Sequence, residues 1–230
     1  MKKSAFLGLL ACLLAITPVF AQKKTTRATS VIHFSEAWVW NYTNATGEKG
    51  SVMIYREPKS GSWLLTKDDA GLGKTDEMTR WFLLQPNGEI LQAYDDPERN
   101  GRPKLHQLRW QKEPVAHLPG HYKPTGKTAR FGTANWGYNP VWGRSYNVSY
   151  QKTSEKTTVY LADSTLDFSA LFAFNSLDMD AKLPIHFPVD IPPKKIPLSE
   201  ETTGAGWNAG YTFEGISSTE YDIDLSAFRK

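Results

Sequence analysis

The chain has 230 residues, of which 40% are hydrophobic and 13% aromatic, so it can bury a core without support from disulfides. Its single cysteine, Cys12, lies in an apolar N-terminal segment that we expect to be removed, which excludes a disulfide framework and a thiol catalyst in the mature chain. Removing Lys2 and Lys3 with that segment leaves 25 basic residues against 24 acidic ones, and this balance predicts no nucleic-acid partner.

The N-terminus has the three parts of a secretory signal peptide. A basic pair at the start precedes an apolar run over residues 5–20, and the small residue Ala21 offers a cleavage site. We therefore predict a signal peptide at 1–21, a flexible polar leader at 22–30, and a mature chain that is secreted or periplasmic.

Cys12 leaves an alternative open. The stretch from Leu9 to Cys12 resembles a bacterial lipidation box, and a lipid on this cysteine would give peripheral membrane association. Against this, the apolar run continues over residues 13–20, whereas the chain after a lipidated cysteine normally turns polar. A retained membrane anchor is a third option, but the run is short for a bilayer.

The mature chain begins with strand patterns. In residues 31–42 bulky apolar side chains recur with a period of two, which is typical of a strand with one apolar face. A turn at 44–50 and a partner strand at 51–56 follow, and 62–66 predicts the next strand. The short spacing indicates an antiparallel meander.

Two apolar runs meet at Asn87-Gly88 within residues 80–94, and this pair is a strong hairpin signal. We expect a two-residue turn with positive φ at both central residues, which Asn and Gly tolerate. The four residues 81–84 are all apolar, so both faces of this strand are apolar. The strand should therefore lie well inside a sheet.

A carboxylate cluster, Asp95, Asp96 and Glu98, follows this hairpin and precedes a strand predicted at 104–111, which carries His106. Two carboxylates are sufficient for a glycosidase, so the cluster keeps a hydrolase hypothesis open. A calcium loop has regular acidic spacing, which a proline interrupts here. We expect instead a solvated hairpin end whose aspartates accept turn hydrogen bonds.

His117 and His121 have the spacing of helical zinc ligands, but Pro119 and Gly120 between them exclude a regular helical turn. No glutamate follows the first histidine, and no third ligand is marked nearby. A Gly-x-Ser-x-Gly nucleophile elbow is also missing. We therefore predict no metal, no cofactor and no catalytic residue, and favour a protein that is not an enzyme.

The most unusual composition lies at 131–144, where aromatic residues are interleaved with Gly, Asn and Pro. Such a composition argues against a long regular strand, so the rings should project from a loop. They can form a flat platform for a ligand, with polar side chains at its edge, or they can fold back as core over one end of the sheet. The candidate ligand-binding residues are Asn135, Trp136, Tyr138, Trp142 and Arg144.

The remaining chain predicts further β structure. Strands at 145–153 and 157–161 form a second hairpin, and residues 163–177 fit a short helix starting near Ser169 or a buried strand equally well. Five prolines in 183–198 indicate an extended arm and argue against an interior strand. Residues 204–210 are expected to be flexible, and 211–215 and 221–225 are predicted to form a last pair of strands.

These patterns predict one β domain over residues 31–230, including the proline-rich arm at 183–198. The fold class is mainly β, with an antiparallel meander that forms a barrel, half-barrel or sandwich and at most one short helix.

Three functions fit this fold. The first is a non-catalytic secreted or envelope protein that binds a small apolar or carbohydrate ligand through aromatic residues. The second is a structural or assembly protein of the envelope that binds other proteins. The third is a hydrolase that uses the carboxylate cluster. The many aromatic residues and the lack of catalytic signatures favour the first.

Overall fold

The structure is a computed structural model that describes residues 31–72, 78–99, 102–109, 120–132, 140–149, 155–177, 181–185, 187 and 194–228. The predicted signal peptide and leader lie outside these residues. The strands are β1 (Val31–Thr43), β2 (Lys49–Glu57), β3 (Ser62–Thr66), β4 (Thr79–Leu84), β5 (Glu89–Asp96), β6 (Arg102–Arg109), β7 (His121–Phe131), β8 (Val141–Ser149), β9 (Lys156–Asp163), β10 (Lys195–Gly204) and β11 (Trp207–Asp224). The helices are α1 (Ser169–Ser176) and two short 3-10 turns, η1 (Pro97–Arg99) and η3 (Leu225–Phe228). None of these helices has the length and apolar character needed to cross a bilayer.

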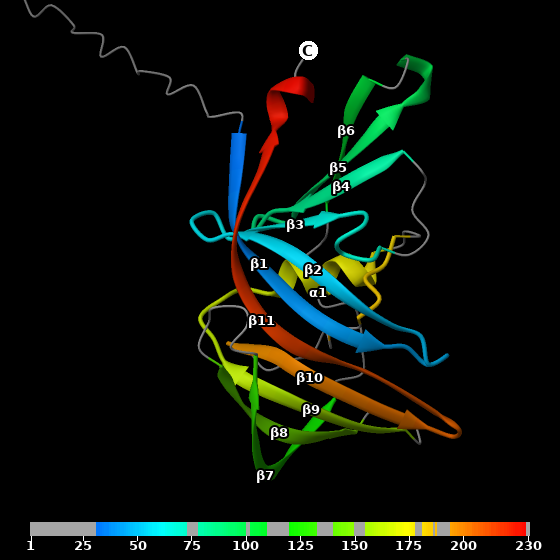
Figure 1. The fold of residues 1–230 in the computed structure, drawn as a ribbon, viewed down its shortest axis with the longest axis vertical. Helices are drawn as coiled ribbons and strands as arrows, with labels where there is room; N and C mark the ends of the chain where they lie inside the picture. The colour runs from blue at the N-terminus through cyan, green and yellow to red at the C-terminus, as the bar shows by residue number, and fades with distance from the viewer. Residues whose placement is uncertain are drawn as a thin grey trace, which may run out of the picture.

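All described strands belong to one antiparallel sheet in the order β6-β5-β4-β3-β2-β1-β11-β10-β9-β8-β7 (Figure 1). Two meanders, β1–β6 and β7–β11, are joined in the middle of the sheet by the pairing of β1 with β11. The sheet is open, because its edge strands β6 and β7 do not pair with each other. The prediction of a mainly β, antiparallel meander with one short helix is therefore confirmed.

The hairpin at Asn87-Gly88 joins β4 to β5 as predicted, but its turn differs. The N–H of Gly88 donates to the carbonyl of Gln85 at 3.0 Å, and Gly88 has a φ of 86° while Asn87 does not have a positive φ. This is a three-residue connection in which a type I turn precedes a left-handed glycine. Pro86 explains the difference, because its fixed φ suits the second position of a type I turn.

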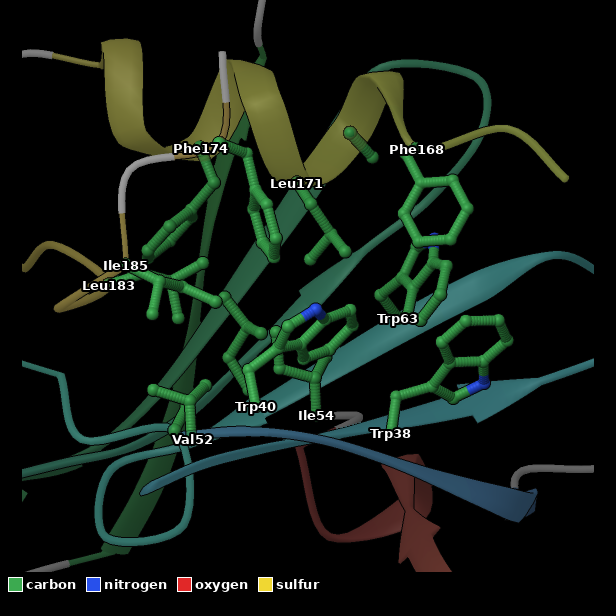
Figure 2. Packing of buried hydrophobic residues seen from close by; sticks show 14 of the residues in the cluster. Trp38, Trp40, Val52, Ile54, Trp63, Phe168, Leu171, Phe174, Leu183 and Ile185 are labelled. Atoms are coloured by element: carbon green, nitrogen blue, oxygen red, sulfur yellow. The ribbon is translucent and has the colours of Figure 1, made fainter. Parts of the chain in front are cut away.

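One face of the first meander forms the main core, which α1 covers (Figure 2). Trp38 and Trp63 point from the sheet towards Phe168 at the start of the helix, with ring centroids 5.6 Å and 5.1 Å from it. Further along the helix, Phe174 packs edge-on against Phe82 of β4. Each of these buried side chains contributes roughly 1.5–3 kcal/mol by leaving water. The helix alternative for residues 163–177 is thus the correct one.

The opposite face of the same strands carries a second apolar cluster, which includes Phe34, Tyr55, Leu64 and Trp81. The C-terminal turn η3 covers part of it, because Phe228 packs edge-on against Trp81 at 5.7 Å. Both faces of β4 are therefore buried, as its four apolar residues predicted.

The proline-rich segment contains a correction. β10 begins at Lys195 and lies between β9 and β11, so the last residues of the predicted arm belong to an interior strand. Proline lacks the N–H that a ladder requires, and the register of β10 against β9 shifts between Pro197 and Ser199. The irregularity accommodates the proline without ending the strand.

The C-terminal strands also differ from the prediction. β11 is one continuous strand, so the two strands predicted at 211–215 and 221–225 do not pair with each other. Its register against β1 shifts twice, each time because β11 contains an extra residue. Residues 204–210, predicted as flexible, form the turn and first pairs of the β10–β11 hairpin. Ser217 and Ser218, between the two predicted strands, lie inside β11.

β7 was not predicted, and it is the edge of the second meander. Beyond its last residue, Gly132 has a φ of 89° and lies against β11, where an added Cβ would be 3.7 Å from the carbonyl oxygen of Glu214. The second meander thus curls until its edge touches the middle of the sheet. On the outer face of this meander, Val148, Val159 and Leu161 form a small buried cluster, whereas the end of β8 at Trp142 is exposed.

Candidate ligand-binding surface

Two of the predicted site residues, Trp142 and Arg144, lie on strand β8, so the prediction that Trp142 projects from a loop is wrong. They point to the same face, since alternate residues of a strand share a face. The Trp142 side chain is 65% exposed, and Arg144 is also exposed. In contrast, four other tryptophans of the described chain are buried: Trp38, Trp40, Trp63 and Trp81. Trp142 is therefore not a core residue.

The neighbouring strands add charged side chains beside this indole. Arg130 of β7 lies directly opposite Trp142, and Leu161 of β9 lies opposite Arg144. Asp163 lies two residues beyond Leu161 on β9 and therefore on the same face. Arg130 and Trp142 are direct cross-strand partners, whereas the pairing of β8 with β9 ends at Arg144 and Leu161. Extending that register by two residues puts Asp163 on the same face, opposite Trp142, so the three residues define a row across the sheet.

Lys195 of β10 completes the row. It lies opposite Asp163, and its Nζ is 2.5 Å from the Asp163 carboxylate oxygen Oδ1. Adjacent strands are about 4.8 Å apart, so the row over four strands is about 14 Å long. That length suits a short chain of sugar rings.

The charges along this row are not evenly matched. The hydrogen bond and charge of Lys195 lower the pKa of Asp163, and the charge of Arg144 adds to this effect. In the described part of the chain, neither Arg130 nor Arg144 forms an ion pair. The surface around Trp142 is therefore net positive, with its positive charge on the β7 and β8 side.

Trp142 is also uncovered by other rings. Among the described residues, no aromatic ring packs against its indole, and the two cations that lie over rings are Arg56 and Lys104, both in the first meander. An exposed, uncovered indole beside charged groups can accept a flat apolar face while its neighbours bind polar groups at the edge.

The other three predicted residues, Asn135, Trp136 and Tyr138, lie outside the described residues. Sequence reasoning did not find Arg130, Asp163 and Lys195, because they come from three different strands. Arg130 could have been found from the β7–β8 hairpin register, in which Phe131 and Val141 are the last pair before the loop.

The carboxylate cluster does not converge. Asp95 and Asp96 are consecutive in β5 and point to opposite faces, and Arg80 Nη2 is 2.8 Å from Asp95 Oδ1. Asp96 is buried and accepts a hydrogen bond from the N–H of Glu98 at 3.0 Å. His106 is paired with Gln92, four residues before Asp96. Asp96 accepts a turn hydrogen bond, as predicted, but its burial differs from the solvated hairpin end that the sequence suggested.

No group of metal ligands occurs in the part of the chain that the structure describes. His121 is exposed at the start of β7, whereas His117 lies outside the described residues. Metal binding by this pair stays untested.

A second concave surface crosses β2, β1, β11 and β10, with a volume of about 740 Å³. Its floor consists of polar side chains that are already paired, since Ser51 donates to Asn41 at 2.6 Å and Asn208 donates to Glu201 at 3.1 Å. Tyr42 borders it but alternates with Asn41 along β1 and points to the opposite face. This trough therefore lacks a ring platform and is a rival location for a polar ligand.

No known protein family matches the chain, and no curated protein matches its sequence. The fold is that of an antiparallel β-protein with an open sheet. Two solved structures of PNGF-II, from different crystal forms, are similar over 86% of this chain, with TM-scores of 0.40 and 0.41 and sequence identities of 13% and 12%. The match covers 30% of the PNGF-II chain in each case.

Proposed function

We propose that this chain is a secreted or envelope-located carbohydrate-binding protein, in which a sugar ring stacks on Trp142. The observation that carries the proposal is the 65% exposed indole on a part of β8 that is paired with β7. The strand fixes the backbone from which the ring projects, so no backbone segment has to become ordered when a ligand stacks on it.

A carbohydrate fits this surface better than an apolar small molecule. Apolar ligands are usually held in concave, largely apolar pockets, whereas Trp142 stands on an open surface between Arg130 and Arg144. The face of the first meander that could enclose an apolar ligand is filled by the side chains of α1 (Figure 2). Sugars combine an apolar ring face with hydroxyl groups at the edge, which matches an indole with guanidinium groups beside it.

A protein partner is the competing occupant, because tryptophan and arginine also dominate the energetics of protein interfaces. The two occupants predict different behaviour. A sugar site binds isolated oligosaccharides, whereas a protein interface does not.

The proposal can be tested by isothermal titration calorimetry with soluble oligosaccharides from β-glucan, xylan, mannan, chitin and polygalacturonate. We expect at least one of them to bind, and Trp142→Ala to weaken that binding about tenfold, since losing about 1.4 kcal/mol of ring contact corresponds to a tenfold change in affinity. Trp142→Phe should recover part of the affinity because it keeps a ring.

Met78→Ala is the matched control, since Met78 is another exposed apolar side chain but lies in the first meander. It should leave the affinity unchanged. Equal binding by wild type and Trp142→Ala would show that the ligand binds elsewhere. The double variant Asn41→Ala with Ser51→Ala would then test the trough as the binding site. No binding to any of the five oligosaccharides would contradict the proposed function.

A further inference from the structure

We propose that the Trp142 surface selects acidic saccharides, whose carboxylate or sulfate groups bind Arg130 and Arg144 on two sides of the indole. This inference depends on the proposed function and names its ligand class. Its starting point is the placement of two exposed cations around one exposed ring.

The two arginines approach Trp142 from different directions. Arg130 is its cross-strand partner on β7, so the two Cα atoms are about 5 Å apart. Arg144 is two residues along the same strand, at about 6.6 Å. A ring stacked on the indole therefore has a guanidinium group within reach of two of its edges.

Neither guanidinium group is paired with an acidic side chain in the part of the chain that the structure describes, so both can bind a ligand anion. Four other described cations have acidic partners: Arg56 with Glu36, Arg80 with Asp95, Lys104 with Asp96, and Lys195 with Asp163. Arg130 and Arg144, like the exposed Lys123 and Lys156, have no ion-pair partner among the described residues, and these two arginines are the ones that flank Trp142.

Arginine suits this task because its planar fork of N–H donors matches the geometry of carboxylate and sulfate groups. The indole recognises the apolar face of a sugar whatever its charge. Discrimination between neutral and acidic sugars must therefore come from the two arginines.

Asp163 makes the charge distribution along this row of residues asymmetric. This carboxylate lies on the β9 side of Trp142 and is held by Lys195, so that end of the row is close to neutral. An anionic group is attracted to the β7 side, where Arg130 stands, and gains nothing on the β9 side. A saccharide with one charged group per ring should therefore bind in one preferred orientation.

The test uses two probes that differ only at their carboxyl groups: oligogalacturonic acid, which is anionic, and the same oligomer fully methyl-esterified, which is neutral. Calorimetry with wild-type protein should show at least tenfold tighter binding of the acid. The double variant Arg130→Gln with Arg144→Gln should remove this preference, because the affinity for the acid should fall at least tenfold more than the affinity for the ester.

The matched control is Lys123→Gln with Lys156→Gln, which removes two exposed cations from the same meander but from residues distant from Trp142. It should leave the preference for the acid intact. If it lowers the affinity for the acid as much as the arginine variant does, the attraction is non-specific and the inference is wrong.

The remaining outcomes separate the inference from the proposed function. Binding of both probes that is lost in Trp142→Ala but is equal for acid and ester would keep the proposed function and overturn the selection for acidic saccharides. Failure of both probes and of the neutral oligosaccharides would overturn both proposals.

Discussion

The two meanders use tryptophan in opposite ways. In the first, Trp38, Trp40 and Trp63 lie beneath α1 and are almost fully buried. In the second, Trp142 sits on an equally regular strand and is exposed. The residue type is the same, so the difference lies in what covers the strand.

The covering helix does not belong to the meander that it covers. α1 lies in the connection from β9 to β10 of the second meander, yet it packs on the first, where the indole N–H of Trp63 donates to the carbonyl of Asp167 at 3.4 Å. A helix of the second meander thus covers one face of the first meander. The outer surface of the second meander at Trp142 is left open, which is the condition for a binding surface.

Replacing Trp40 with alanine tests the buried side of this comparison. Trp40 is 0% exposed and packs against Phe187 and Phe213. We expect the free energy of unfolding to fall by about 3–5 kcal/mol, because removing a large buried ring leaves a cavity. Urea denaturation followed by circular dichroism measures this loss. Trp142→Ala is the paired control and should change the same quantity by less than about 0.5 kcal/mol.

Gly143→Ala sharpens the comparison within a single strand. Gly143 follows Trp142 on β8 but points inward, where an added Cβ would lie 3.0 Å from side-chain atoms of both Leu198 and Phe131. These neighbours must move, so we expect a loss of about 1–3 kcal/mol by the same urea assay. If the small Gly143→Ala change proved harmless while Trp142→Ala destabilised the protein, the assignment of inner and outer faces would be wrong.

The smallest effect concerns the second apolar cluster at alkaline pH. Burial, followed by the hydrogen bond from the Tyr55 hydroxyl to Asp69 at 2.8 Å, raises the pKa of Tyr55 above its ordinary value of 10.0. Burial also raises the pKa of Tyr221, which stacks on Tyr55. Above about pH 10 the unfolded chain loses these protons first, so stability should fall as the pH rises; below pH 10 both states keep them and the effect vanishes.

Tyr55→Phe isolates this contribution. The variant lacks the titrating hydroxyl, so its stability should fall less steeply with pH above 10 than that of the wild type. Denaturant midpoints across this alkaline range provide the measurement. Parallel curves for the two proteins would show that Tyr55 titrates alike in the folded and unfolded chain.

Much of the first meander could be predicted from the sequence, because its strands and turns depend on residues that are close together in the chain. The period-two pattern in residues 31–42 and the apolar run at 81–84 correspond to β1 and β4. The turn between β4 and β5 was located correctly, although its geometry was decided by Pro86 rather than by Asn87. The alternation of apolar residues and the choice of turn residues determine structure over a few positions, and a sequence pattern can be recognised over that distance.

The second meander was harder because its strands depend on distant partners. β7 has mostly exposed residues, since an edge strand on an open surface needs few apolar side chains. β11 looks interrupted in the sequence, but pairing with β1 keeps it one continuous strand through its polar centre. For the same reason the candidate surface was predicted only in part. Trp142 and Arg144 stood out by composition, whereas Arg130 becomes their neighbour only through strand register.

The pairing of β1 with β11 also determines how the chain can fold. Val31 lies opposite Asp224, so the central ladder joins residues about 190 positions apart, and such non-local pairing slows folding. Each meander can form its hairpins from neighbouring segments, but the sheet is completed only when the first and last strands meet. Until then β1 and β11 are both unpaired edges with apolar side chains, and the interval before they meet is when the chain is most exposed to association with other copies of itself.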